Sequence, residues 1–232
     1  FLAAFEGMCA DMLSASPARA FPVQTLDALL TRSLAARELA KELTRCAAGV
    51  VASTSVAPLR VLALGADNSA FVRALLGVVE PLRGSVCVVD ADAGRLDALN
   101  DAFAAAPAFS VCGPDEAPAR SFDLVLGANV RFGRSTIGLD WLRERLADGG
   151  RLAIVEWAGG VFADLVQLAT DSAGRKSLGE PLTEARLTEA GFEDVAATAN
   201  GAAAMVVAHR PPRAPAEDAP AIERTAARIW PG

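Results

Sequence analysis

Hydrophobic and polar positions follow one pattern before Pro58 and another after it. Before it, leucines recur near helical spacing and charged residues occupy the opposite side, which predicts a helical segment within residues 1–57. Thr25 or Asp27 is suited to cap its start. The leucines are Leu26, Leu29, Leu30, Leu34, Leu39 and Leu43.

After Pro58, short apolar runs alternate with stretches of helical periodicity. Strands are expected over 60–64, 85–90, 108–111, 121–128, 151–157, 192–198 and 203–209, and helices over 69–79, 94–105, 138–146 and 183–190. Strands that are apolar throughout and separated by helices indicate a parallel sheet covered on both faces. Asn200-Gly201 is a strong hairpin signal, so the last strand should run antiparallel to its neighbour. The prediction is a doubly wound, mostly parallel, seven-stranded Rossmann-like α/β sheet with an antiparallel last strand.

The composition changes again near Pro211, where proline and alanine dominate. We therefore expect three parts: a helical, lid-like segment over 1–57, an α/β domain over 58–210, and a linker over 211–232 that leads to a following domain. The chain opens on Phe1 without a methionine or a basic leader, which suggests a piece of a longer protein.

Charge and composition exclude several functions. The net charge is -6, which argues against a broad basic face for nucleic acid. No apolar run approaches the roughly 20 residues that span a bilayer. With His209 as the single histidine, a histidine-rich metal site or a two-histidine mechanism is impossible, so no metal is expected. The four cysteines are far apart, which favours free thiols and a cytoplasmic location.

Five segments carry a family resemblance, and they span roughly residues 58–210. Their sequences are VLALGA at 61–66, VDAD at 89–92, FDLVLGANVRFG at 122–133, LADGGRLAIVE at 146–156 and LTEAGFEDV at 187–195. Together they resemble a class I S-adenosylmethionine methyltransferase. They are closer to the C-methyltransferase domain of polyketide synthases and related fatty-acid megasynthases. That resemblance implies that the predicted sheet is the seven-stranded sheet of a class I methyltransferase.

The resemblance also marks a cofactor site that has lost several of its residues. Gly65 remains in the first turn, but Ala63 replaces the family's glutamate, and Asp67 occupies the place of a second glycine. Asp90 ends the second strand, where an acid can bind ribose hydroxyls. Asn129 follows the fourth strand and completes the remnant cofactor-binding set. The alternatives are an ordinary turn in which Asp67 or Asn68 caps the next helix, and a plain loop and helix cap at Asp90 and Asp92.

The catalytic position has changed as well. Phe132 stands where the resembled family has histidine, and a phenyl ring can neither accept a proton nor stabilise an enolate. Glu156 matches a family glutamate and is either a remnant of the site or a loop cap. His209 is expected late on the last strand, remote from the cofactor edge. Cys112 has no nearby histidine in sequence and is interpreted as a core thiol.

These changes lead to three hypotheses. The first is a non-catalytic, structural methyltransferase-like domain of a multidomain polyketide or fatty-acid synthase, with no cofactor expected to bind well. Its partners would be neighbouring domains, including a ketoreductase region, and the acyl carrier protein, with no nucleic acid and no membrane. The second is an active C-methyltransferase that binds S-adenosylmethionine and acts on a carrier-bound β-ketoacyl thioester. The third is a separate nucleotide- or acyl-binding module.

Overall fold

The computed structural model describes residues 34–53, 58–65, 69–128, 137–157, 182–200 and 203–212. Within them the helices are α3 (Leu34–Ser53), α4 (Ser69–Val79), α5 (Ala93–Ala102), α6 (Leu139–Arg145) and α8 (Glu184–Glu189), with a short 3-10 turn, η1 (Glu80–Leu82). The strands are β1 (Arg60–Leu64), β2 (Ser85–Val89), β3 (Phe109–Cys112), β4 (Phe122–Ala128), β5 (Leu146–Trp157), β6 (Glu193–Asn200) and β7 (Ala203–His209). Thr25 and Asp27 lie outside these residues.

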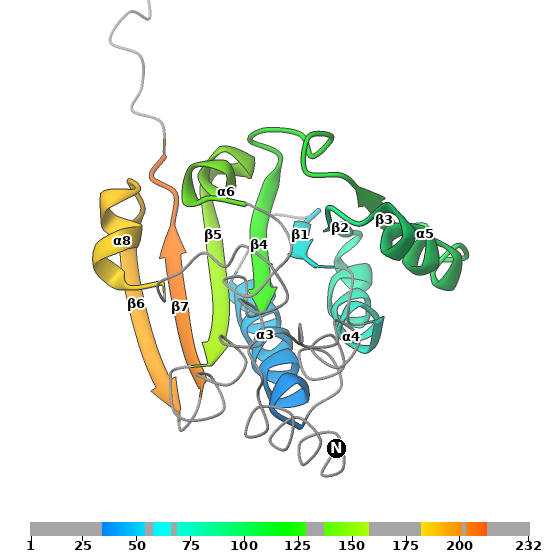
Figure 1. Ribbon diagram of the computed structural model, residues 1–232, viewed down its shortest axis with the longest axis horizontal. Coiled ribbons are helices and arrows are strands. Elements are labelled where there is room, and N and C mark those ends of the chain that lie inside the picture. The colour runs from blue at the N-terminus through cyan, green and yellow to red at the C-terminus, as the bar shows by residue number, and fades with distance from the viewer. Residues whose placement is uncertain are drawn as a thin grey trace, which may run out of the picture.

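The seven strands form one sheet in the order β3-β2-β1-β4-β5-β7-β6 (Figure 1). Strands β1 to β5 pair in parallel. Strand β7 runs antiparallel to both β5 and β6. The predicted fold class, a mostly parallel seven-stranded sheet with an antiparallel last strand, is therefore confirmed.

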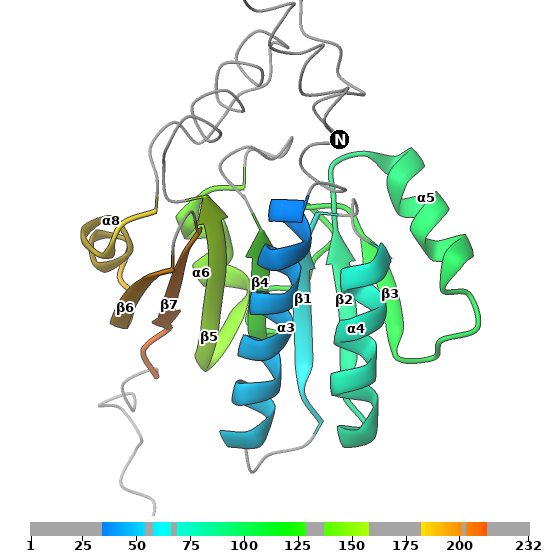
Figure 2. The ribbon, with the colours of Figure 1, turned by 90° about the horizontal axis from the view of Figure 1, so that it is seen from below.

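Helices cover both faces of this sheet, as the buried apolar residues of its central strands require. Helices α3 and α4 lie side by side over one face (Figure 2). They share a buried cluster with α5, whereas α6 and α8 contribute to a second cluster on the other face. Leu43, Ala47 and Val50 of α3 pack in the same cluster as Val61 of β1. Helix α3 is thus part of the core of the α/β layers.

The start of β5 differs from the prediction. We expected a helix to residue 146 and a strand from 151, but α6 ends at Arg145 and β5 begins at Leu146. Gly149 adopts a φ of +75°, and its N–H donates to the Arg210 carbonyl at 3.1 Å. Gly150 accepts from the Arg210 N–H at 2.9 Å. These two glycines allow an irregular strand where the sequence suggested a stop, because backbone pairing continues through the bend.

None of the helices within the described residues is long and apolar enough to cross a membrane.

Candidate cofactor site

The sheet has a topological switch point between β1 and β4. From β1 the chain proceeds outward to β2 and β3 and then returns to β4 on the other side. In open α/β sheets, ligands bind outside the carboxyl ends of the strands at such a point. The arrowheads of β4 and β5 mark this edge at the lower side of Figure 1. The residues that end β1, β2, β3 and β4 are therefore the candidate site.

Gly65 makes the first turn of this edge. Its φ is +88°, a conformation that side chains with a Cβ rarely adopt, and its N–H donates to the Val89 carbonyl at 2.9 Å. A Cβ placed on Gly65 would meet no atom within 4 Å. Backbone conformation, and not lack of space, is what requires glycine at this position.

Ala63 lies two residues before Gly65 and is 1% exposed. Its methyl group belongs to the apolar cluster that also contains Val72 and Leu126. The family that the sequence resembles has a glutamate at this position. A carboxylate placed here would lose its water in an apolar setting, at a cost of several kcal/mol unless it were paired.

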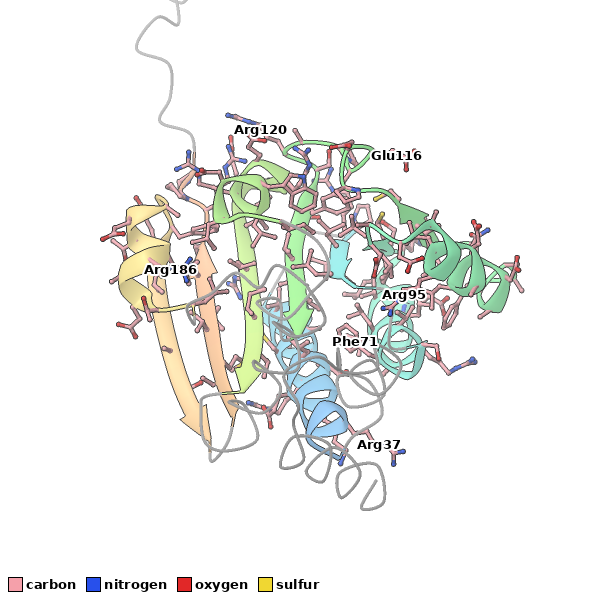
Figure 3. The ribbon with its side chains drawn as sticks, viewed as in Figure 1. Arg37, Phe71, Arg95, Glu116, Arg120 and Arg186 are labelled. Carbon is pink, nitrogen blue, oxygen red and sulfur yellow. The ribbon has the colours of Figure 1, made fainter. Side chains whose placement is uncertain are left out.

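Asp90 follows β2 and is the only polar or charged residue that is buried among those the structure describes, at 8% exposure. Its Oδ1 accepts the backbone N–H of Asp92 at 2.9 Å. Asp92 in turn caps α5, accepting the N–H of Arg95 at 3.3 Å and pairing with the Arg95 Nε at 3.5 Å. Arg95 is labelled at the start of α5 in Figure 3. Both carboxylates thus stabilise the turn from β2 into α5.

The end of β3 is stabilised in a similar way. Glu116 lies in the segment between β3 and β4 (Figure 3), and its Oε2 accepts the Gly113 N–H at 2.8 Å. The indole Nε1 of Trp141, on α6, donates to the Pro114 carbonyl at 3.2 Å. The Glu116 side chain therefore folds back onto its own loop.

Two thiols meet beside this strand end, which sequence reasoning missed. The Sγ atoms of Cys87 on β2 and Cys112 at the end of β3 are 3.1 Å apart. A hydrogen bond from Cys112, opposed by burial and assisted by Ser110, lowers the pKa of Cys87 to about 7. The bond to Cys87, burial and the Glu116 carboxylate raise the pKa of Cys112. Parallel strand order was the signal that would have brought the two cysteines together.

The remaining predicted site residues are only partly within reach of the structure. Asp67, Asn129 and Phe132 lie outside the described residues. The backbone of Glu156 lies near the carboxyl end of β5 and pairs with Ala204 of β7, but its side chain is outside the description. Of the predicted set, Gly65, Asp90 and the backbone of Glu156 therefore lie at the same end of the sheet.

His209 lies at the opposite end of the strands from the candidate site. Because β7 is antiparallel, its last residue pairs with Arg151, well before the carboxyl end of β5 at Trp157. Trp157 lies six positions after Arg151, which at about 3.3 Å per residue is about 20 Å. His209 instead approaches Asp194, with Nδ1 3.3 Å from Oδ2. The predicted remoteness of this histidine from the site is confirmed.

No family model and no curated protein matches this chain. Solved structures do match. The carbon methyltransferase of CurJ has a TM-score of 0.65 at 18% identity, over 83% of this chain and 60% of that one. The CMeT domain of the citrinin polyketide synthase has a TM-score of 0.66 at 17% identity, over 82% of this chain and 56% of that one.

The fold is that of a class I methyltransferase. The DszA carbon methyltransferase agrees, with a TM-score of 0.64 at 16% identity, over 84% of this chain and 60% of that one. This chain thus spans less than two thirds of the length of each of these three methyltransferases. At these identities the likeness establishes the fold, and the residues of the site must decide the chemistry.

The described residues keep some groups that could face S-adenosylmethionine and offer no carboxylate at others. Gly65 supplies an open turn, but Ala63 supplies only a methyl group to the apolar core. An oxygen of Asp90 already holds the Asp92 N–H, and Glu116 holds that of Gly113. Each carboxylate thus uses one of its two oxygens in a local turn. A metal offers no substitute within the described residues, which contain no group of three or more metal-binding side chains.

Proposed function

We propose that this chain is a non-catalytic, structural methyltransferase-like domain of a multidomain polyketide or fatty-acid synthase. The position of His209 carries the proposal. The sequence contains one histidine, and that histidine lies about 20 Å along the sheet from the cofactor edge. The resembled family has a histidine as its base, and this chain has Phe132 at the corresponding position.

The state of the cofactor edge supports the same conclusion independently. A methyltransferase must bind its cofactor before it can transfer a methyl group, and the described carboxylates here are engaged in local turns. Ala63 stabilises the fold, because it makes an apolar contact where the resembled family has a charged glutamate. Such a substitution favours the scaffold over the site.

The structural role would be exerted on neighbouring parts of the same synthase. We propose a ketoreductase region and the acyl carrier protein as its partners, as the resemblance implies. The extensive apolar core on both faces of the sheet would let the domain act as a rigid spacer in such an assembly.

An active C-methyltransferase is the second candidate, and two observations favour it. Gly65 retains its positive φ with open space beside it, and Asp90 retains its place at the end of β2. These are two features that an S-adenosylmethionine site needs. A carrier-bound β-ketoacyl thioester would be its substrate.

Methyl transfer is the experiment that separates the two candidates. The protein is incubated with S-adenosylmethionine and a panel of carrier-bound β-ketoacyl thioesters, and the acyl groups are weighed by mass spectrometry. We expect no added methyl group from the natural protein. A Phe132→His variant supplies the missing base and is expected to stay inactive, because the cofactor edge is altered as well. Methylation by the natural protein would establish the second candidate.

A further inference from the structure

We propose that Cys87 and Cys112 form a two-thiol modification site, which a low-molecular-weight disulfide oxidises to an intramolecular disulfide. The inference concerns the thiols alone and holds whether or not the domain is catalytic.

Proximity is the first observation. The two residues are 25 positions apart in sequence, yet their Sγ atoms lie 3.1 Å from each other. Both side chains pack against the same apolar cluster, and both residues are only partly buried. A disulfide bond is about 2.05 Å long, so closure needs the sulfurs to approach by about 1 Å.

The position of β3 in the sheet makes this approach feasible. Cys87 pairs in register with Ser110, so Cys112 is its diagonal neighbour, two residues further along. Among the strands of the described residues, β3 is the outermost, has four residues and pairs only with β2. A small displacement of such an edge strand disturbs one ladder, whereas the same movement of a central strand would disturb two.

The two thiols differ in their readiness to react. Cys87 is the better nucleophile near neutral pH, because Cys112 and Ser110 donate hydrogen bonds that lower its pKa to about 7. Cys112 lies near the Glu116 carboxylate, which adds to the increase in its pKa. Cys46 provides a contrast, since burial raises the pKa of its thiol.

The reaction balances as two exchange steps with glutathione disulfide. The Cys87 thiolate attacks one sulfur of the oxidant, forms a mixed disulfide and releases one glutathione thiolate. Cys112 then attacks the Cys87 sulfur, and the second glutathione leaves. The protons of both cysteines end on the two glutathione thiols. The protein pair is oxidised by two electrons, and the oxidant is reduced by two.

Formation of the disulfide would also change the surroundings of residues beyond the two cysteines. Gly113 and Pro114 follow Cys112 directly, and Pro114 accepts the Trp141 Nε1 hydrogen bond from α6. A displacement of the end of β3 therefore changes the surroundings of this indole. Tryptophan fluorescence provides a second readout, when Trp157 and Trp230 are replaced by phenylalanine.

The test uses a Cys9→Ser, Cys46→Ser variant, in which Cys87 and Cys112 are the only remaining cysteines. It is treated with glutathione disulfide near neutral pH, quenched with acid, alkylated and digested for mass spectrometry. We expect a peptide pair joined through Cys87 and Cys112, with the loss of two hydrogen atoms. A further Cys112→Ser change should instead trap a mixed glutathione disulfide on Cys87.

A Cys87→Ser change should abolish the internal cross-link and slow the first adduct, because burial and the Glu116 carboxylate still raise the pKa of the remaining Cys112 thiol. The same double variant in denaturing urea is the matched control, and its internal cross-link should form more slowly because proximity is lost. Glutathione adducts on both cysteines without a cross-link, a disulfide between two chains, or no reaction would each overturn the proposal. Equally fast cross-linking in urea would overturn it too. Mapping the cross-link in the natural protein gives the same answer if a variant fails to fold.

Discussion

Replacing glycine by alanine should have opposite effects on stability at Gly65 and at Gly49. Gly65 has a φ of +88°, whereas Gly49 lies within α3. A Cβ added at either position meets no atom within 4 Å, so neither substitution by alanine carries a packing penalty. The two variants therefore differ only in the backbone conformation that alanine must adopt.

The magnitudes follow from that difference. A left-handed backbone costs a residue with a Cβ about 1 to 2 kcal/mol. The loss of unfolded-state freedom offsets about 0.4 to 1 kcal/mol of this. Gly65→Ala should therefore lower the free energy of unfolding by about 1 kcal/mol. Gly49→Ala should raise it by about 0.5 to 1 kcal/mol, because alanine is the better helix former.

Urea denaturation followed by circular dichroism measures both variants against the natural protein. The expected difference between them is about 2 kcal/mol, with unchanged dependence on urea. Thermal unfolding should separate them by several degrees in the same order, at about 2–4 °C per kcal/mol for a chain of this size. If Gly65→Ala stabilised the protein as much as Gly49→Ala, the positive φ assigned to the first turn would be refuted.

Three further predictions concern packing and ionisation. Gly84→Ala should lower the free energy of unfolding by about 3 kcal/mol in urea denaturation, because the new Cβ meets the Leu59 carbonyl oxygen. This loss exceeds the one expected for Gly65→Ala, and a loss under about 1 kcal/mol would contradict the reasoning. Leu62→Ala, in the fully buried core, should cost about 2–5 kcal/mol by the same assay, and a neutral result would count against the packing described. Iodoacetamide should label Cys87 with a rate that rises through a midpoint near pH 7 as the thiolate forms, whereas the rate at Cys46 should rise only at higher pH. Coincident pH profiles at the two cysteines, read by mass spectrometry, would refute the assignment.

The sequence specified most of the fold because its elements are strongly patterned. The predicted strand over 60–64 and helix over 69–79 match β1 and α4 to the residue. The Asn200-Gly201 signal correctly predicted the antiparallel pairing of the last strands. The prediction for residues 146–150 was wrong. Two consecutive glycines in the sequence suggest that regular structure stops there, and only the backbone pairing with Arg210 shows a bent strand.

The site was less predictable because it depends on contacts that sequence spacing does not reveal. The resemblance located Gly65 and Asp90 at one edge, but not the Asp90 bond to the Asp92 N–H. The approach of Cys87 to Cys112 depends on strand order and register, which are set by the whole sheet. A motif thus places residues at an edge, whereas the hydrogen bonds there determine which groups a ligand can use.

Isothermal titration of the protein with S-adenosylmethionine tests the central claim most directly. The altered first turn, with Ala63 and Asp67 in place of the resembled family's glutamate and glycine, leads us to expect no binding heat, or a Kd weaker than about 1 mM. An Asp67→Gly variant, which removes the added charge from the turn, provides the matched comparison. Binding by the natural protein in the micromolar range would contradict the claim that the fold has outlasted its cofactor site.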